Sequence, residues 1–220
     1  MTASAVTPRL TLTQQAAVAR VAYAVERPSA LALLCGPAGV GKSRVLSSLA
    51  AAPALASRTI AMRTIHEVGN AWQARGAASV PDVLIVDDAH LATDGQLPGL
   101  VQSFLRNQAR GSVVLCGEGR LLSLVARDTR LEQAVVLRAS LPPFTLDESR
   151  MLVAAAAAGI GSPAERDEIA CTIHEIAAGI PALVVRLAEL VDVLVQSSPG
   201  RAVSADDVEA LHRRLCLQAA

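Results

Sequence analysis

Hydrophobic residues in the first part of the chain fall into short uninterrupted runs, separated by stretches with helical spacing of apolar positions. The apolar runs have the length of single strands and lie at 31–35, 58–63, 83–87, 112–116 and 134–138. The helical stretches lie near 11–27, 40–51, 64–76, 95–109 and 120–127. Apolar strands that alternate with helices are typical of a parallel sheet covered on both faces, so the sequence predicts an α/β core with five parallel strands.

The pattern changes after "SLPPF" at 140–144, because only helical periodicity continues from there. Four further helices are predicted, over 146–158, 163–177, 181–196 and 204–216. Serine, proline and acidic residues near their starts suit helix N-termini. We therefore expect two domains, an α/β core over 1–142 and a small helical subdomain over 143–220.

The amino-acid composition of the chain argues against some classes of binding partner. Acidic and basic residues number 20 each, so no net charge attracts the chain to nucleic acid or to an anionic membrane. Aromatic residues make up 2% of the chain, which argues against a base-stacking surface. The sequence has no signal-peptide pattern and no apolar run of about 18 residues, so we expect a cytoplasmic protein without direct membrane insertion.

The segment "CGPAGVGKSR" at 35–44 carries the strongest chemical signal. It fits the G-x-x-x-x-G-K-[ST] pattern of a phosphate-binding loop, whose backbone N–H groups surround nucleotide phosphates. Lys42 is the single lysine among 20 basic residues, and its compact ammonium fits between phosphate oxygens where a guanidinium is too broad. The Ser43 hydroxyl is predicted to hold Mg²⁺. The predicted nucleotide-binding residues are Gly36, Pro37, Ala38, Gly39, Val40, Gly41, Lys42, Ser43 and Arg44.

The segment "VLIVDDAH" at 83–90 ends an apolar strand with two carboxylates. Ligands of open α/β sheets bind at the carboxyl ends of the strands, so we expect both carboxylates at that edge. Asp87 is predicted to hold Mg²⁺ through water, and Asp88 occupies the position of a residue that activates the attacking water. A solvated turn at the end of the strand is the alternative interpretation, which two aspartates also suit.

Three further segments follow these two motifs, namely "VVLCGEGRL", "LPPF" and "AAGIPALVVRLAEL". In these segments and in the two motifs above, the chain resembles bacterial AAA+ ATPases of the general secretion pathway protein A type, which are related to transposition ATPases. The resemblance extends from about residue 10 to 215. It implies a P-loop NTPase core with strand order 5-1-4-3-2, a C-terminal helical lid, and ATP and Mg²⁺ as ligands. In that order the first and fourth strands are neighbours, so Cys35 and Cys116 are expected close together beside the nucleotide.

Two acidic positions depart from the family's pattern. The family's Walker B motif usually ends in Asp-Glu, whereas this chain has Asp87-Asp88. Because aspartate is one methylene shorter than glutamate, a water-activating carboxylate at 88 would be displaced by about 1 Å. Such a displacement can lower the rate by about 10²-fold. Glu118 stands where the sensor 1 region usually offers a glutamine, and it can still contact water.

Two arginines are absent from their usual positions. Ala134 replaces the arginine that would act on a neighbouring subunit's nucleotide, and Arg127 and Arg130 are the nearest candidates for that role. Ala182 replaces the sensor 2 arginine of the lid, and Arg186, one helical turn onward, is the nearest substitute. The candidate catalytic residues are therefore Asp88, Glu118, Arg127, Arg130 and Arg186.

Three functions remain open at this point. The first is a Mg²⁺-dependent ATP hydrolase of low turnover, which acts as a motor or switch for a protein assembly and forms a nucleotide-dependent homo-oligomer. The second is a nucleotide-gated binding module with little turnover, which Asp88, Ala134 and Ala182 favour. The third is a DNA-associated ATPase in transposition, which the zero net charge disfavours.

Overall fold

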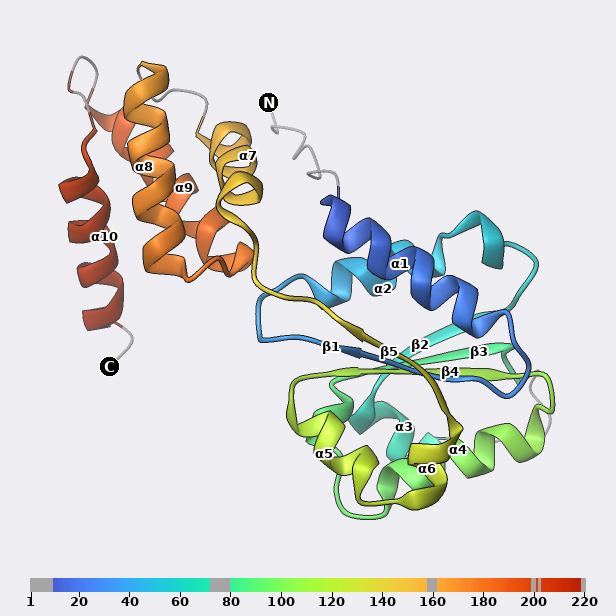
Figure 1. Ribbon diagram of the computed structural model, residues 1–220. Helices are drawn as coiled ribbons and strands as arrows, with labels where there is room; N and C mark the ends of the chain where they lie inside the picture. Colours follow the sequence, from blue (N-terminus) through green and yellow to red (C-terminus); the bar gives the residue numbers. More distant parts are fainter. Residues whose placement is uncertain (1–9, 72–79, 158–161, 199–200, 202, 219–220) are drawn as a thin grey trace. The chain divides into compact units, whose positions relative to one another are not determined.

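The computed structural model describes residues 10–71, 80–157, 162–198, 201 and 203–218 (Figure 1). The chain divides into two compact units, Leu10–Pro142 and Pro143–Ala220. The first contains a sheet with helices and is called the α/β unit below. The second contains only helices among its described residues and is called the helical unit.

Within its described residues, the α/β unit has one sheet of five parallel strands in the order β2-β3-β4-β1-β5. The strands are β1 (Leu31–Cys35), β2 (Ile60–Thr64), β3 (Val83–Asp87), β4 (Ser112–Gly117) and β5 (Val135–Ser140). The central strands β3, β4 and β1 are almost entirely buried, because helices cover both faces. The predicted parallel sheet and its strand order are confirmed.

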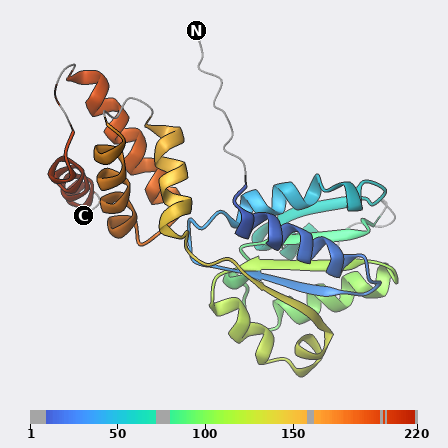
Figure 2. The same ribbon diagram turned by 45° about the horizontal axis from the view of Figure 1, so that its top comes forward.

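Two layers of helices enclose this sheet (Figures 1 and 2). One face is covered by α1 (Leu12–Val25), α2 (Lys42–Ala50) and the short 3₁₀ helix η1 (Pro53–Leu55). The other face is covered by α3 (Ile65–Ala71), α4 (Gln96–Asn107), α5 (Arg120–Ala126) and α6 (Thr129–Ala134). Successive strand residues enter opposite layers, as Leu34 and Leu33 do in β1.

The short helix α6 is the main element that the hydrophobic pattern missed. Its N-cap is Asp128, whose carboxylate accepts hydrogen bonds from two backbone N–H groups of the first turn. Six residues are too few to show helical periodicity, and α6 runs directly into β5. The predicted helix over 64–76 reaches into 72–79, which lies outside the described residues.

Cys35 and Cys116 lie on neighbouring strands but face opposite layers. In the β1–β4 pairing, Cys116 is opposite Leu34 and Cys35 is opposite Gly117. Cys116 belongs to the apolar cluster under α1 and α2, and Cys35 belongs to the cluster on the other face. The expected proximity therefore holds for the strands, while the two thiols lie on different sides of the sheet.

The helical unit consists of α7 (Leu146–Ala156), α8 (Pro163–Ala177), α9 (Pro181–Ser197) and α10 (Ala205–Gln218) around a separate apolar core. Its first two helices begin with capping boxes, in which Thr145 pairs with Glu148 and Ser162 pairs with Glu165. The hydrogen bonds from Ser162 hold the pKa of the Glu165 carboxyl below its usual value. None of the described helices has both the length and the apolar character of a membrane span.

Polar contacts also join α7 to α8. Ser149 is fully buried, and its Oγ lies 2.9 Å from His174 Nδ1. Arg150 of α7 pairs with Asp147 on its own helix and with Asp167 on α8, and these hydrogen bonds raise the pKa of its guanidinium. These contacts all involve side chains of the same unit.

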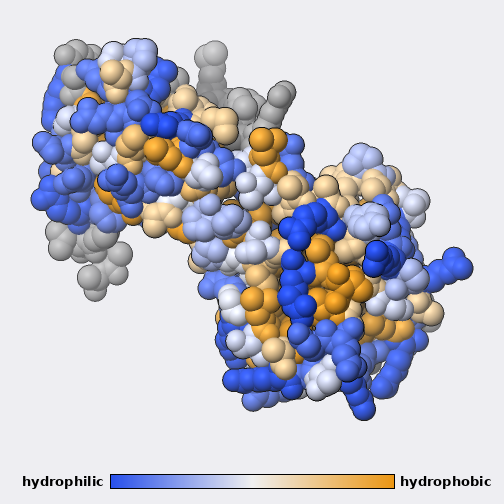
Figure 3. All heavy atoms as spheres, in the orientation of Figure 1, coloured by the Kyte–Doolittle hydropathy of each residue, from blue (hydrophilic) through white to orange (hydrophobic). Residues whose placement is uncertain are grey.

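The strand β5 forms one edge of the sheet. Figure 3 shows hydrophobic residues together on the face of the α/β unit along which β5 runs, and Val136 is exposed there. Arg138 on the same strand pairs with Glu132 of α6. Charged side chains on an edge strand oppose pairing with another chain, so this edge is protected.

Candidate nucleotide site

The phosphate-loop motif lies between β1 and α2, at the carboxyl edge of the sheet. Gly41 has φ +96°, which L-residues with a side chain rarely adopt. A Cβ at Gly36 would lie 2.7 Å from the Leu141 carbonyl oxygen, so a side chain is excluded there as well. Pro37, Ala38 and Gly39 form the exposed crest of the loop, while Val40 is buried beneath it.

Lys42 is the first residue of α2, and its side chain folds back over the loop. Its Nζ donates hydrogen bonds to the carbonyl oxygens of Gly36 (3.0 Å) and Pro37 (2.9 Å), and the residue is only 9% exposed. No side chain caps the N-terminus of α2 in the described part of the chain. An ammonium held beside uncapped backbone N–H groups is a ready binding site for an anion.

Ser43 and Asp87 meet although they belong to different elements. The Ser43 hydroxyl of α2 donates to Asp87 Oδ2 at the end of β3, over 3.2 Å. The strand β4 lies between β3 and β1, so this contact joins the two motifs across the sheet edge. A hydroxyl and a carboxylate this close fit the oxygen ligands that Mg²⁺ prefers.

Asp88 stands in a tight turn immediately after β3. Its φ is +54°, and its backbone N–H donates to Asp87 Oδ1 over 2.9 Å. The structure therefore contains the strand-end turn, and the same turn fixes the Asp87 carboxylate that contacts Ser43. The turn and a metal-binding role for Asp87 are compatible.

A buried thiol lies next to this carboxylate. Burial raises the pKa of Cys116, and the charge and hydrogen bonding of Asp87 raise it further. Burial likewise raises the pKa of Cys35, although the positive charges of Lys42 and Arg138 oppose this shift. Both thiols stay neutral at pH 7 and behave as small apolar groups in the two layers of the core.

Glu118 follows β4 at the same edge and pairs with His90, a residue that was not among the predicted site residues. His90 Nε2 lies 3.8 Å from Glu118 Oε1, and the His90 side chain is 14% exposed. The His90 Nδ1 atom is buried without a hydrogen-bond partner in the described structure. Arg120 donates to the His90 carbonyl oxygen. A Cβ at Gly117 would lie 2.9 Å from the His90 backbone nitrogen, so Gly117 allows this close approach.

Sequence reasoning did not predict the contact of His90 with Glu118, because the two residues follow different strands. Only the order β3-β4 brings their ends together.

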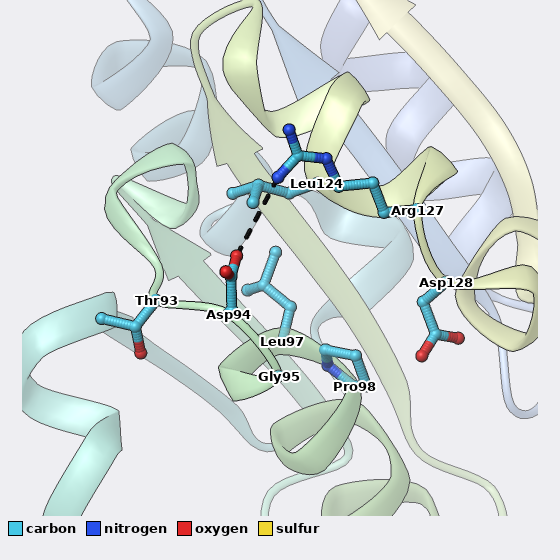
Figure 4. Close-up of a pocket in the computed structure, with 8 residues that line it drawn as sticks. All are labelled: Thr93, Asp94, Gly95, Leu97, Pro98, Leu124, Arg127 and Asp128. Atoms are coloured by element: carbon cyan, nitrogen blue, oxygen red, sulfur yellow. Dashed lines mark ion pairs between the residues drawn. The ribbon is translucent and has the colours of Figure 1, made fainter.

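The candidate arginines lie on exposed surfaces. Arg127 is the C-cap of α5 and forms an ion pair of 4.0 Å with Asp94 in the lining of a pocket of about 250 Å³ (Figure 4). The pocket is lined by Thr93, Asp94, Gly95, Leu97, Pro98, Leu124, Arg127 and Asp128. Arg130 is exposed in the first turn of α6, and Arg186 is exposed on α9 of the helical unit. Arg44 lies half-buried on α2, next to Ser43.

No protein-family model matches the sequence, and no curated protein matches it significantly. The solved structures that share its fold include the following three. The ORC2 protein of Aeropyrum pernix, solved as ADPNP–ADP complexes, has a TM-score of 0.63 at 16% identity over 91% of this chain and 67% of that chain. The Holliday junction branch migration motor RuvB of Thermotoga maritima has a TM-score of 0.61 at 17% identity over 90% and 65%. NtrX of Brucella abortus has a TM-score of 0.64 at 13% identity over 91% and 54%.

These three proteins are AAA+ P-loop ATPases. The chain shares their P-loop NTPase fold. It spans about two thirds of ORC2 and RuvB and about half of NtrX. At such low identities the likeness defines the fold, and conclusions about ligand and activity depend on the residues of the site itself.

Proposed function

We propose that the protein binds Mg²⁺–ATP at the phosphate loop. The observation that carries this proposal is the hydrogen bond between Ser43 and Asp87, which joins the two motifs beside the buried Lys42. On nucleotide binding, Lys42 would exchange the carbonyl oxygens of Gly36 and Pro37 for phosphate oxygens. The N-terminus of α2 would bind the same phosphates through its backbone N–H groups.

Hydrolysis of ATP is the reaction that this arrangement supports. When bound, Mg²⁺ would neutralise phosphate charge, with Ser43 and Asp87 as the residues that hold it. Asp88 and Glu118 are the carboxylates at the sheet edge that could orient the attacking water, and Glu118 lies 3.8 Å from the imidazole of His90. We expect low turnover, because Asp88, Ala134 and Ala182 replace groups that the resembled family uses in catalysis.

We further propose that the protein is a motor or switch that forms a nucleotide-dependent homo-oligomer and acts on a protein partner. In this proposal residues 1–142 are the nucleotide-binding core, and residues 143–220 are a lid that responds to the nucleotide. Arg127 and Arg130 are exposed, as a residue that reaches a neighbouring subunit's γ-phosphate must be. Such an arginine raises turnover by about 10³–10⁵. The general secretion pathway protein A type remains the proposed subfamily.

A nucleotide-gated binding module is the second candidate. The observation that favours it is the alanine at both 134 and 182, since neither the core nor the lid carries an arginine at the family's usual position. ATP would then set a conformational state that a partner recognises, with little phosphate release.

Steady-state phosphate release across a range of protein concentrations distinguishes these candidates. An oligomeric ATPase is expected to show specific activity that rises with protein concentration and falls by about 10³-fold in Arg127→Ala or Arg130→Ala. Arg106→Ala is the matched control, because Arg106 is an exposed arginine on α4 whose hydrogen bond goes to Gln102. ATP binding with negligible release at every concentration would instead support the binding module.

A further inference from the structure

The N-terminus of α1 is fixed by a capping box. Thr11 Oγ1 accepts a hydrogen bond from the Gln14 backbone N–H over 3.3 Å, and Gln14 Oε1 accepts one from the Thr11 N–H over 3.2 Å. This arrangement occupies the oxygen end of the Gln14 side-chain amide. The nitrogen end remains available for a contact outside the helix.

The Gln14 amide nitrogen lies against the phosphate loop. Gln14 Nε2 is 3.4 Å from the Val40 carbonyl oxygen, and the residue is only 3% exposed. A Cβ at Gly41 would lie 2.6 Å from the same nitrogen and would displace the amide, and the φ of +96° independently favours glycine there. Glutamine is rarely buried this deeply unless both ends of its amide are engaged.

The position of this contact gives it a role in the site. Val40 and Gly41 directly precede Lys42, so the Gln14 amide supports the loop at the point where α2 begins. A shift of these two residues would move Lys42 and the backbone N–H groups of the first turn of α2. Displacements of about 1 Å can cost about 10²-fold where groups must meet a ligand in fixed geometry.

We propose that Gln14 is a positioning residue that holds the phosphate loop in its nucleotide-binding conformation. This inference rests on the nucleotide binding proposed above. The two ends of the amide have separate tasks: the oxygen caps α1, and the nitrogen supports the loop. A residue that acted only as a cap would affect the stability of the protein and leave nucleotide affinity unchanged.

Four variants separate these tasks. Gln14→Glu keeps the side-chain length and the oxygen that accepts from Thr11, but it places a carboxylate oxygen against the Val40 carbonyl. Gln14→Met removes the donor without burying a charge, in case Gln14→Glu fails to fold. Thr11→Ala weakens the cap and leaves the Gln14 amide at the loop. Gln15→Glu makes the same change of charge at the next residue, which is exposed and donates to the Leu10 carbonyl oxygen.

The experiment measures Mg²⁺–ATP affinity by calorimetry and the Tm of each nucleotide-free protein. Gln14→Glu is expected to weaken ATP affinity by about tenfold or more, and Gln14→Met by about fivefold. Gln15→Glu and Thr11→Ala should bind ATP within about twofold of the wild type, although Thr11→Ala lowers the Tm by about 2–4 °C.

Wild-type affinity in both Gln14 variants would overturn the inference, as would an equal loss of affinity in Thr11→Ala. A wild-type protein that binds no ATP would overturn the proposed function as well, so the two failures are distinguishable.

Discussion

The α/β unit and the helical unit differ in what surrounds particular buried polar side chains. In the helical unit the buried Ser149 contacts His174, and Arg150 forms ion pairs with Asp147 and Asp167. At the sheet edge of the α/β unit, Lys42 is held only by backbone carbonyls, and the buried Nδ1 of His90 has no partner among the described residues. Polar groups that satisfy one another stabilise a fold, whereas groups left open at one edge of a sheet form a site.

The largest effect that this comparison predicts is the loss of nucleotide binding in Lys42→Ala. ATP affinity should fall by about 100-fold or more, because the ammonium makes charge-assisted hydrogen bonds to the phosphates. The Tm of the nucleotide-free protein should stay close to that of the wild type, since Lys42 contacts only the loop carbonyls. Calorimetry and thermal denaturation check the two parts. Unchanged ATP affinity would contradict the assignment of the site.

Asp87→Asn is expected to have the next largest effect. It should weaken ATP affinity in Mg²⁺ by about tenfold, or about 1.4 kcal/mol, and leave the affinity in EDTA unchanged. The control is Asp82→Asn, which makes the same substitution at the other end of β3, where Asp82 binds Thr59. If Asp82→Asn alters the Mg²⁺ dependence of ATP affinity as much as Asp87→Asn does, the assignment of Asp87 as the residue that holds Mg²⁺ is wrong.

Ser149→Ala tests whether the polar contact in the helical unit affects the stability of the protein and not its nucleotide affinity. Removing the hydroxyl leaves His174 Nδ1 without its partner, so the free energy of unfolding should fall by about 1 kcal/mol. ATP affinity should remain within about twofold of the wild type. Urea denaturation and calorimetry measure the two quantities. A loss of affinity without a loss of stability would show that this pair serves the site.

The smallest predicted effect is a loss of stability in acid. The pKa of Glu165 is lowered by its hydrogen bonds to Ser162, and the pKa of Asp207 is lowered in the same way by Ser204. Their stabilising effect is therefore complete above the unfolded pKa of about 4 and is lost as the pH falls through the lower folded values. Glu165→Gln should make the Tm less dependent on pH in this range. An unchanged dependence would rule out this cap as its source.

The sequence predicted the sheet well because buried parallel strands leave uninterrupted apolar runs, as in β1, β3 and β4. It missed α6, whose start depends on a single cap at Asp128. The loop and the end of β3 were also predicted as site candidates, since each motif is continuous in sequence.

The contacts between motifs could not be predicted in the same way. Gln14 reaches Val40 and His90 reaches Glu118 only after the chain has folded, and no local pattern records such pairs. The "TLTQ" segment at 11–14 offered a signal for Gln14, because it fits a capping box that ends in glutamine instead of glutamate.

The most direct test of the account is the ATP dissociation constant of the wild-type protein, measured by calorimetry with Mg²⁺ and again with EDTA. The account predicts micromolar binding in Mg²⁺ and weaker binding in EDTA, because Ser43 and Asp87 hold the metal beside Lys42. The absence of binding up to millimolar ATP under both conditions would contradict it.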